Sequence, residues 1–179
     1  ASAARLIAAF AQAGVPAGAV NLVFGMPEEV SAYLIPHPVI RKISFTGSSA
    51  VGKKLAALAG LHMKRTTMEL GGHAPVLVME DADIDRAVAI MSAVKFRNAG
   101  QLCVAPTRFL VAEPVYAEFV EKFTGAARAL KVGAGLSEDT TMGPLVSGRR
   151  VEAMDSLVQD AIQSGATLVT GGRRIGNSG

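Results

Sequence analysis

The chain has 179 residues, of which 50% are hydrophobic and 18% are charged, and its formal net charge is +3. This composition excludes intrinsic disorder, and the length has room for one ordinary domain or two small lobes. Basic residues occur as scattered pairs and aromatic residues make up only 5% of the chain, so a surface dedicated to nucleic acid is not expected.

Helical and strand patterns alternate along the first part of the chain. They predict, in order, helix 2–13, strand 20–24, helix 27–34, strand 43–45 and helix 48–59. Gly14 and Gly25 stand where the first helix and the first strand end. The longest uncharged run, residues 6–27, is interrupted by Pro, Gly and polar residues, so we do not expect it to span a membrane.

The same alternation continues through the rest of the chain. The predicted order is strand 65–69, strand 74–79, a helix capped by Asp83, strand 107–111, a helix from Pro114, a helix capped by Ser147, and strand 167–170. Gly71-Gly72 indicates a boundary between residues 1–70 and 71–179. Strands that alternate with helices predict an α/β fold with largely parallel strands.

Residues 45–54 predict a strand that runs through a small-residue turn into a helix. The free N–H groups at such a helix start favour a bound anion, typically a phosphate. Gly47 and Gly52-Lys53 also fit the spacing of a P-loop, but Lys54 stands where that motif needs Ser or Thr for magnesium. A P-loop and a plain strand–turn–helix both stay open on this pattern alone.

Glu69 ends a predicted strand and is followed, after Leu70, by two glycines that permit close approach of a ligand. Partial burial there would raise the pKa of its carboxyl towards the range useful for a general base. A salt-bridged or helix-capping Glu is the alternative.

Cys103 is the only cysteine, which excludes a disulfide framework and a cysteine-rich zinc site. It follows a polar turn that contains Gly100, so an accessible thiolate is as plausible as a small buried hydrophobe. No histidine stands near it in sequence as an activating base, and the three histidines are too dispersed for a metal motif. We therefore expect no metal site.

Three ordered motifs together resemble the aldehyde dehydrogenase superfamily. They are F-T-G-S-x-x-V-G from Phe45, E-L-G-G from Glu69, and G-Q-x-C ending at Cys103. Glu69 and Cys103 lie 34 residues apart, which is the interval typical of the family. The resemblance covers essentially the whole chain and implies parts of two Rossmann-like three-layer lobes.

The resemblance also implies the residues that act. Cys103 matches the nucleophile, and Glu69 matches the base that hydrolyses the thioester, which disfavours the CoA-acylating branch. Arg97 matches an arginine that holds the distal carboxylate of the substrate in succinate-semialdehyde dehydrogenases; a surface arginine at a helix end is the alternative. NAD or NADP would contact residues of the first part of the chain: Gly25, Gly47, Ser48, Ser49, Ala50, Val51, Gly52 and Leu70.

By this resemblance the chain is an internal piece of a longer protein. A cytoplasmic location is expected because the sequence shows no membrane-spanning run and no clear signal peptide. Residues 1–70 match the late part of the cofactor-binding domain, and residues 71–179 match the opening of the catalytic domain. The implied partner is a small aldehyde, with no nucleic acid or membrane partner, and the full-length protein is expected to form a homo-oligomer. A non-catalytic fragment or binding module is the other alternative to an NAD(P)-dependent oxidation.

Overall fold

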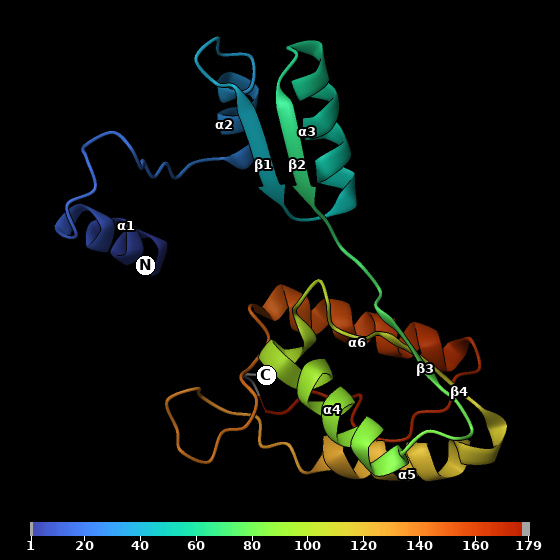
Figure 1. The fold of residues 1–179 in the computed structure, drawn as a ribbon. Coiled ribbons are helices and arrows are strands. Elements are labelled where there is room, and N and C mark those ends of the chain that lie inside the picture. The colour runs from blue at the N-terminus through green and yellow to red at the C-terminus, as the bar shows by residue number, and fades with distance from the viewer. Residues whose placement is uncertain (1, 177–179) are drawn as a thin grey trace. The chain divides into compact units, whose positions relative to one another are not determined.

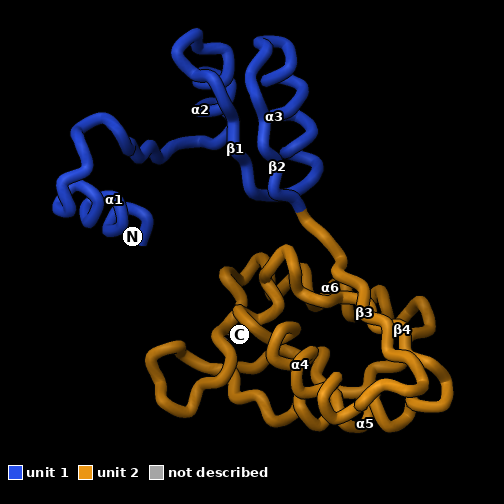
Figure 2. The backbone as a smooth tube through the Cα atoms, in the orientation of Figure 1, with its two compact units in different colours: residues 1–70 blue, residues 71–179 orange. Residues whose placement is uncertain are grey.

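The computed structural model describes residues 2–176. They divide into two compact units, with the boundary between Leu70 and Gly71 (Figure 2). Each unit contains a two-stranded parallel sheet whose strands are joined through a helix (Figure 1). The predicted α/β class with parallel strands is therefore confirmed.

The first unit holds two strands and three helices: α1 (Ser2–Gln12), α2 (Pro27–Leu34), β1 (Lys42–Thr46), α3 (Ser49–Leu61) and β2 (Arg65–Glu69). β1 and β2 pair in register from Lys42 opposite Arg65 to Thr46 opposite Glu69. This register brings Thr46 and Glu69 together at the carboxyl ends of both strands. Ligands of open α/β sheets bind at this edge.

The half-buried side chain of Lys64 joins the two strands at the other end of the first sheet. The Nζ of Lys64 donates to the carbonyl oxygens of His37 at 2.9 Å and Ile40 at 2.8 Å. These two carbonyls belong to the turn that leads into β1, so the side chain joins the start of β2 to the start of β1.

The second unit has the order β3 (Pro75–Val78), α4 (Ile84–Phe96), the 3-10 turn η1 (Arg97–Gly100), β4 (Arg108–Val111), α5 (Glu113–Arg128) and α6 (Gly148–Gln163). β3 and β4 are parallel, with Pro75 opposite Arg108 and Val78 opposite Val111. Helices α4 and α5 lie side by side (Figure 1).

The core of the second unit lies between its sheet and helices α4 and α5. Its buried members are Val78, Ile84, Val88 and Phe119. Phe109 from β4 adds an aromatic cluster, in which its ring centroid lies 5.1 Å from that of Phe123 and 5.7 Å from that of Phe119. Apolar area and aromatic pairing together hold the helices on the sheet.

Two predicted strands are absent from the described residues. Residues 20–24 and 167–170 form no ladder with another strand. Val23 and Phe24 are 65% and 73% exposed, so their apolar pattern is not matched by burial here. A strand needs a paired neighbour to satisfy its backbone, and neither segment has one among residues 2–176.

The predicted helix caps are partly correct. Asp83 caps α4, because its Oδ1 accepts from the N–H of Arg86 at 3.0 Å. Ser147 occupies the cap position of α6 but its side chain makes no capping hydrogen bond. The prediction of a side-chain cap was therefore right for Asp83 and wrong for Ser147.

We expect Phe119→Ala to lower the free energy of unfolding of the full-length protein by about 3–5 kcal/mol, because truncation leaves a cavity in the core. Phe119 is 3% exposed, whereas Leu136 is fully exposed. Leu136→Ala is therefore the control, with an expected change within about 0.5 kcal/mol. Denaturant titration of both variants measures the difference, and equal effects would contradict this core.

Candidate functional site

The turn between β1 and α3 is very short. β1 ends at Thr46 and α3 starts at Ser49. The N–H of Gly47 donates to the carbonyl oxygen of Glu69 at 3.0 Å, so the turn is tied to the end of β2. A phosphate-cradling P-loop wraps a longer loop before its Gly-Lys pair, whereas here Gly52 lies inside α3. The P-loop alternative does not fit this geometry.

The start of α3 nevertheless suits an anion. Ser48 is the N-cap, and its Oγ accepts from the N–H of Val51 at 3.4 Å. The N–H groups of Ser49 and Ala50 have no carbonyl partner within the helix, because every α-helix leaves its first N–H groups unpaired. These donors and the positive end of the helix dipole favour a phosphate.

Gly47 in the turn and Gly52 inside α3 each stand close to a neighbouring side chain. A Cβ at Gly47 would collide with the ring of Phe45. A Cβ at Gly52 would lie 2.6 Å from Cδ2 of Leu70, and Gly52 is buried. The side chain of Leu70 therefore packs directly on α3, which places the start of the E-L-G-G motif against the cofactor-type turn.

A cavity of about 680 Å³ lies between α2, β1 and α3. Gly25 and Val51, both predicted from the sequence, are part of its wall. Most of the other lining residues were not predicted: Val23, Pro27, Glu28, Val30, Ser31, Ala32, Leu34, Ile35, Ile43, Ser44, Phe45, Lys54, Leu55 and Leu58. The wall is mostly apolar with a few polar groups, as is typical of small-molecule and cofactor sites.

The α2 side of this cavity could have been found from spacing. Val30 and Leu34 stand four residues apart on one face of α2, and such a face indicates a buried or ligand-covered surface.

The thiol of Cys103 is exposed, as the accessible reading of the sequence predicts. The chain approaches it through three successive residues with positive φ: Asn98 at 52°, Ala99 at 54° and Gly100 at 73°. Only glycine adopts this left-handed region without strain, although asparagine tolerates it. The turn redirects the chain as it leaves α4, so that Cys103 follows a loop rather than a helix.

The side chain of Gln101 ties this turn to two places. Its Nε2 donates to the carbonyl oxygen of Asn98 at 3.0 Å, and its Oε1 accepts from the N–H of Val146 at 3.1 Å. The side chain of Asn98 returns a bond of 3.3 Å to the carbonyl oxygen of Gln101. Gln101 was not predicted as a functional residue, because nothing in its local sequence points to Val146.

The residues after Cys103 are braced by the segment that follows Leu70. A Cβ at Gly72 would lie 3.2 Å from the carbonyl oxygen of Cys103, so Gly72 permits a close backbone approach. The hydroxyl of Thr107 donates to the carbonyl oxygen of His73 at 2.7 Å, and His73 Nδ1 lies 3.1 Å from the same Oγ1. The second Gly of E-L-G-G and the cysteine loop therefore form one packed structure within the second unit.

Two cationic side chains stand at the end of α4. Desolvation by partial burial lowers the pKa of Lys95. Arg97 is exposed and lines a cavity of about 410 Å³ formed with α5 and residues 141–143. Cys103 is not among the residues that line that cavity.

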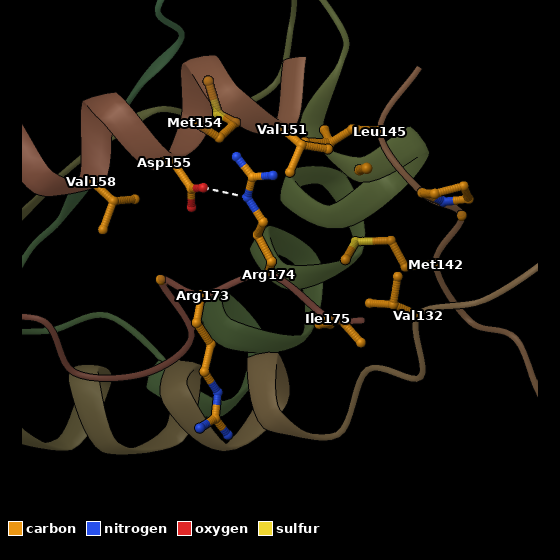
Figure 3. Close-up of a pocket in the computed structure, with 14 residues that line it drawn as sticks. Val132, Met142, Leu145, Val151, Met154, Asp155, Val158, Arg173, Arg174 and Ile175 are labelled. Atoms are coloured by element: carbon orange, nitrogen blue, oxygen red, sulfur yellow. Dashed lines mark hydrogen bonds and ion pairs between the residues drawn. The ribbon is translucent and has the colours of Figure 1, made fainter. Parts of the chain in front are cut away.

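A third cavity, of about 280 Å³, lies under α6 (Figure 3). Its wall is largely apolar, with Val151, Met154 and Val158 on the helix side. The Nε of Arg174 donates to Oδ2 of Asp155 at 2.5 Å, and this bond raises the pKa of Arg174. The lining contains none of the predicted site residues.

The two units divide the predicted residues between them. The first carries the cofactor-type turn, its cavity and Glu69, and the second carries Arg97 and Cys103. Glu69 is exposed, so the partial burial considered for its carboxyl is not found in the described chain. Among residues 2–176, no group of three or more His, Cys, Asp or Glu could hold a metal ion, and no helix is both long and apolar enough to cross a membrane.

Comparison with known proteins identifies relatives. The chain is 53% identical over 155 residues to 4-(hydroxymethyl)benzenesulfonate dehydrogenase TsaD1 of Comamonas testosteroni, covering 87% of this chain and 32% of that protein. It is 48% identical over 163 residues to the mitochondrial succinate-semialdehyde dehydrogenase of Arabidopsis thaliana, covering 91% of this chain and 31% of that protein. The chain thus spans about a third of the length of these curated relatives.

Solved structures agree with the sequence relatives. An NADP-dependent enzyme of E. coli superposes with a TM-score of 0.94 at 41% identity, covering 98% of this chain and 36% of that one. The fold is therefore that of parts of two Rossmann-like lobes, as the motif resemblance implies. The model of the aldehyde dehydrogenase family matches residues 1–179, and the chain belongs to the aldehyde dehydrogenase family.

Proposed function

We propose that the full-length protein containing this chain oxidises an aldehyde with a distal anionic group to the carboxylic acid, using NAD or NADP. Succinate semialdehyde is the substrate that the motifs favour. The observation that carries the proposal is the exposed Cys103 thiol after its left-handed turn, in a chain that matches the family along its whole length.

Cys103 is the proposed nucleophile. Its thiolate attacks the aldehyde carbon to form a tetrahedral thiohemiacetal, and the N–H of Cys103 is one donor to the developing oxyanion. A bound nicotinamide cofactor would supply the acceptor for the hydride of this carbon, and loss of that hydride would leave a thioester on Cys103. The exposed position of Cys103 leaves its thiol accessible to a substrate carbonyl.

Glu69 is the proposed general base for the second half of the reaction. Its carboxylate takes a proton from water, the hydroxide adds to the thioester carbon, and the acid leaves with return of the Cys103 thiolate. Glu69 ends β2 at the carboxyl edge of the first sheet, an edge where ligands of such sheets bind. A hydrolytic base at this position favours acid formation over acyl transfer to CoA.

The first unit is the proposed late part of the cofactor-binding domain. The N–H groups at the start of α3, with Ser48, suit a cofactor phosphate. The cavity beside Gly25 and Val51 has apolar walls that suit an adenine ring. The family uses NAD in some members and NADP in others, and both stay in the proposal.

Arg97 is the proposed anion-holding residue. A guanidinium forms paired, charge-assisted hydrogen bonds with a carboxylate or a sulfonate. The names of both relatives above specify substrates with such a group: one is a sulfonate, and the other is the semialdehyde of succinate. Arg97 is exposed, so its guanidinium is accessible to an anion, which supports the same role.

The second unit is the proposed opening of the catalytic domain. Residues 1–179 alone are expected to be inactive or nearly so, because the family residues that bind the cofactor riboses and complete the oxyanion hole have no counterpart among the matched motifs. The homo-oligomeric state of the full-length protein stays a prediction.

Cys103→Ala in the full-length protein is expected to abolish turnover, because no thioester can form. Glu69→Gln is expected to lower the steady-state rate by about 10²–10⁴-fold, while one equivalent of reduced cofactor per site still forms in the first turnover. Stopped-flow absorbance at the reduced-nicotinamide band measures both. Glu138→Gln, at an exposed loop position, is the control, and full activity of Cys103→Ala would refute the mechanism.

Arg97→Ala is expected to lower kcat/KM for succinate semialdehyde by about 10- to 100-fold, since a hydrogen bond to a charged group contributes about 1.5–3 kcal/mol. Butanal has a similar length and no distal charge, so its kcat/KM should stay the same. Arg97→Lys keeps the charge but not the planar fork of the guanidinium. Its kcat/KM for succinate semialdehyde should therefore lie between the values of the wild type and Arg97→Ala. An equal loss for both aldehydes would show that Arg97 supports the loop and does not recognise the anion.

Val51→Asp is expected to weaken binding of NAD(P)H by about tenfold or more, because a carboxylate would stand in the cavity wall beside the proposed phosphate donors. An acidic residue in the first turn favours the helix itself, so a folding defect is not the expected cause. Quenching of cofactor fluorescence measures the Kd. Leu61→Asp, at the far end of α3 where the side chain is 81% exposed, should leave the Kd unchanged.

A further inference from the structure

The loop that carries Cys103 starts from a conformation that local sequence does not favour. Ala99 holds φ at 54° and ψ at 33°, a left-handed state that is unfavourable for a residue with a Cβ. A larger residue is not expected to replace Gly100 without strain, because its φ is positive and a Cβ would lie 3.3 Å from the carbonyl oxygen of Lys95. Such strain persists only where surrounding contacts hold it in place.

The side chain of Gln101 supplies these contacts from both ends of its amide. The donor end reaches back to Asn98 at the start of the turn, and the acceptor end receives the N–H of Val146. The N–H of Gln101 also donates to the carbonyl oxygen of Asn98 at 3.1 Å. One side chain thus closes the turn and joins it to a segment 45 residues away in sequence.

The segment that receives Gln101 is itself held. Met142 pairs with Val132 in an isolated bridge, and Met142 and Leu145 are part of the wall of the cavity under α6 (Figure 3). Ala99 of the left-handed turn and residues 142–145 line this same cavity. Gln101 is the hydrogen-bonded link between them in the described part of the chain.

We propose that Gln101 is a positioning residue for Cys103: through its bonds to Asn98 and Val146 it holds the strained turn that sets the direction of the nucleophile. This inference rests on the proposed function of Cys103. Gln101 is uncharged and its donor and acceptor are both used, so its contribution is geometric. A misplacement of the thiol by about 1 Å costs about 10²-fold in rate.

The test uses the full-length protein with succinate semialdehyde and its preferred cofactor. Gln101→Met keeps the length of the side chain and removes both hydrogen bonds. Val146→Pro removes the N–H that Gln101 accepts, at a position whose side chain is 79% exposed. Turnover is expressed per active site, counted from the initial burst of reduced cofactor, and Tm is recorded for every variant.

Each single variant is expected to lower kcat per site by about tenfold or more, with KM for the aldehyde unchanged. The double variant is expected to be no slower than Gln101→Met, because both changes remove one shared contact. If Gln101 only stabilised the fold, Gln101→Met would lower Tm and the number of active sites but leave kcat per site unchanged. Gln163→Met, at the exposed end of α6, is the control for the substitution itself.

Unchanged kcat per site in Gln101→Met overturns the proposal, and so do losses that multiply in the double variant. If Val146→Pro lowers the Tm, the result for Gln101→Met decides alone. Cys103→Ala in the same assay distinguishes failure of the proposed function from failure of the positioning role. Residual turnover by Cys103→Ala refutes the proposed function. If Cys103→Ala is inactive and Gln101→Met is fully active, only the positioning role is refuted.

Discussion

The left-handed turn at Asn98–Gly100 is the constraint on which the candidate chemistry of this chain depends. Helix α4 ends at Phe96, and Arg97 already leaves helical geometry with a ψ of 130°. The turn then carries the chain from the end of the helix to Cys103 in an exposed loop. Two of its three residues have a Cβ in the left-handed region, so the conformation must be imposed by contacts from outside the turn.

Close backbone approach is the second requirement, and it is met by glycine in both units. Gly52 lets Leu70 pack on α3, and Gly72 lets the backbone lie against the carbonyl oxygen of Cys103. Gly72 follows the unit boundary and lies against the cysteine loop, whereas Gly71 has open space around it. Part of the sequence pattern that identifies the family therefore marks positions where a Cβ would be crowded.

The sequence was informative where structure depends on local pattern. The strand–helix–strand order, the Asp83 cap and the exposed thiol all follow from residues close together in the chain. It failed at residues 20–24 and 167–170, because apolar alternation does not show whether a pairing strand is present. It also missed the bond from Gln101 to Val146, since a contact across 45 residues leaves no trace in local spacing.

In the second unit, the turn before Cys103 and the proposed substrate-binding residue depend on different kinds of interaction. The turn before Cys103 is fixed by neutral amide hydrogen bonds, which neither titrate near neutral pH nor weaken in salt. The proposed recognition of substrate relies instead on the exposed charge of Arg97, whose attraction is screened by ions. Ionic strength should therefore act on KM for an anionic aldehyde while the geometry of the nucleophile, and with it kcat, is maintained.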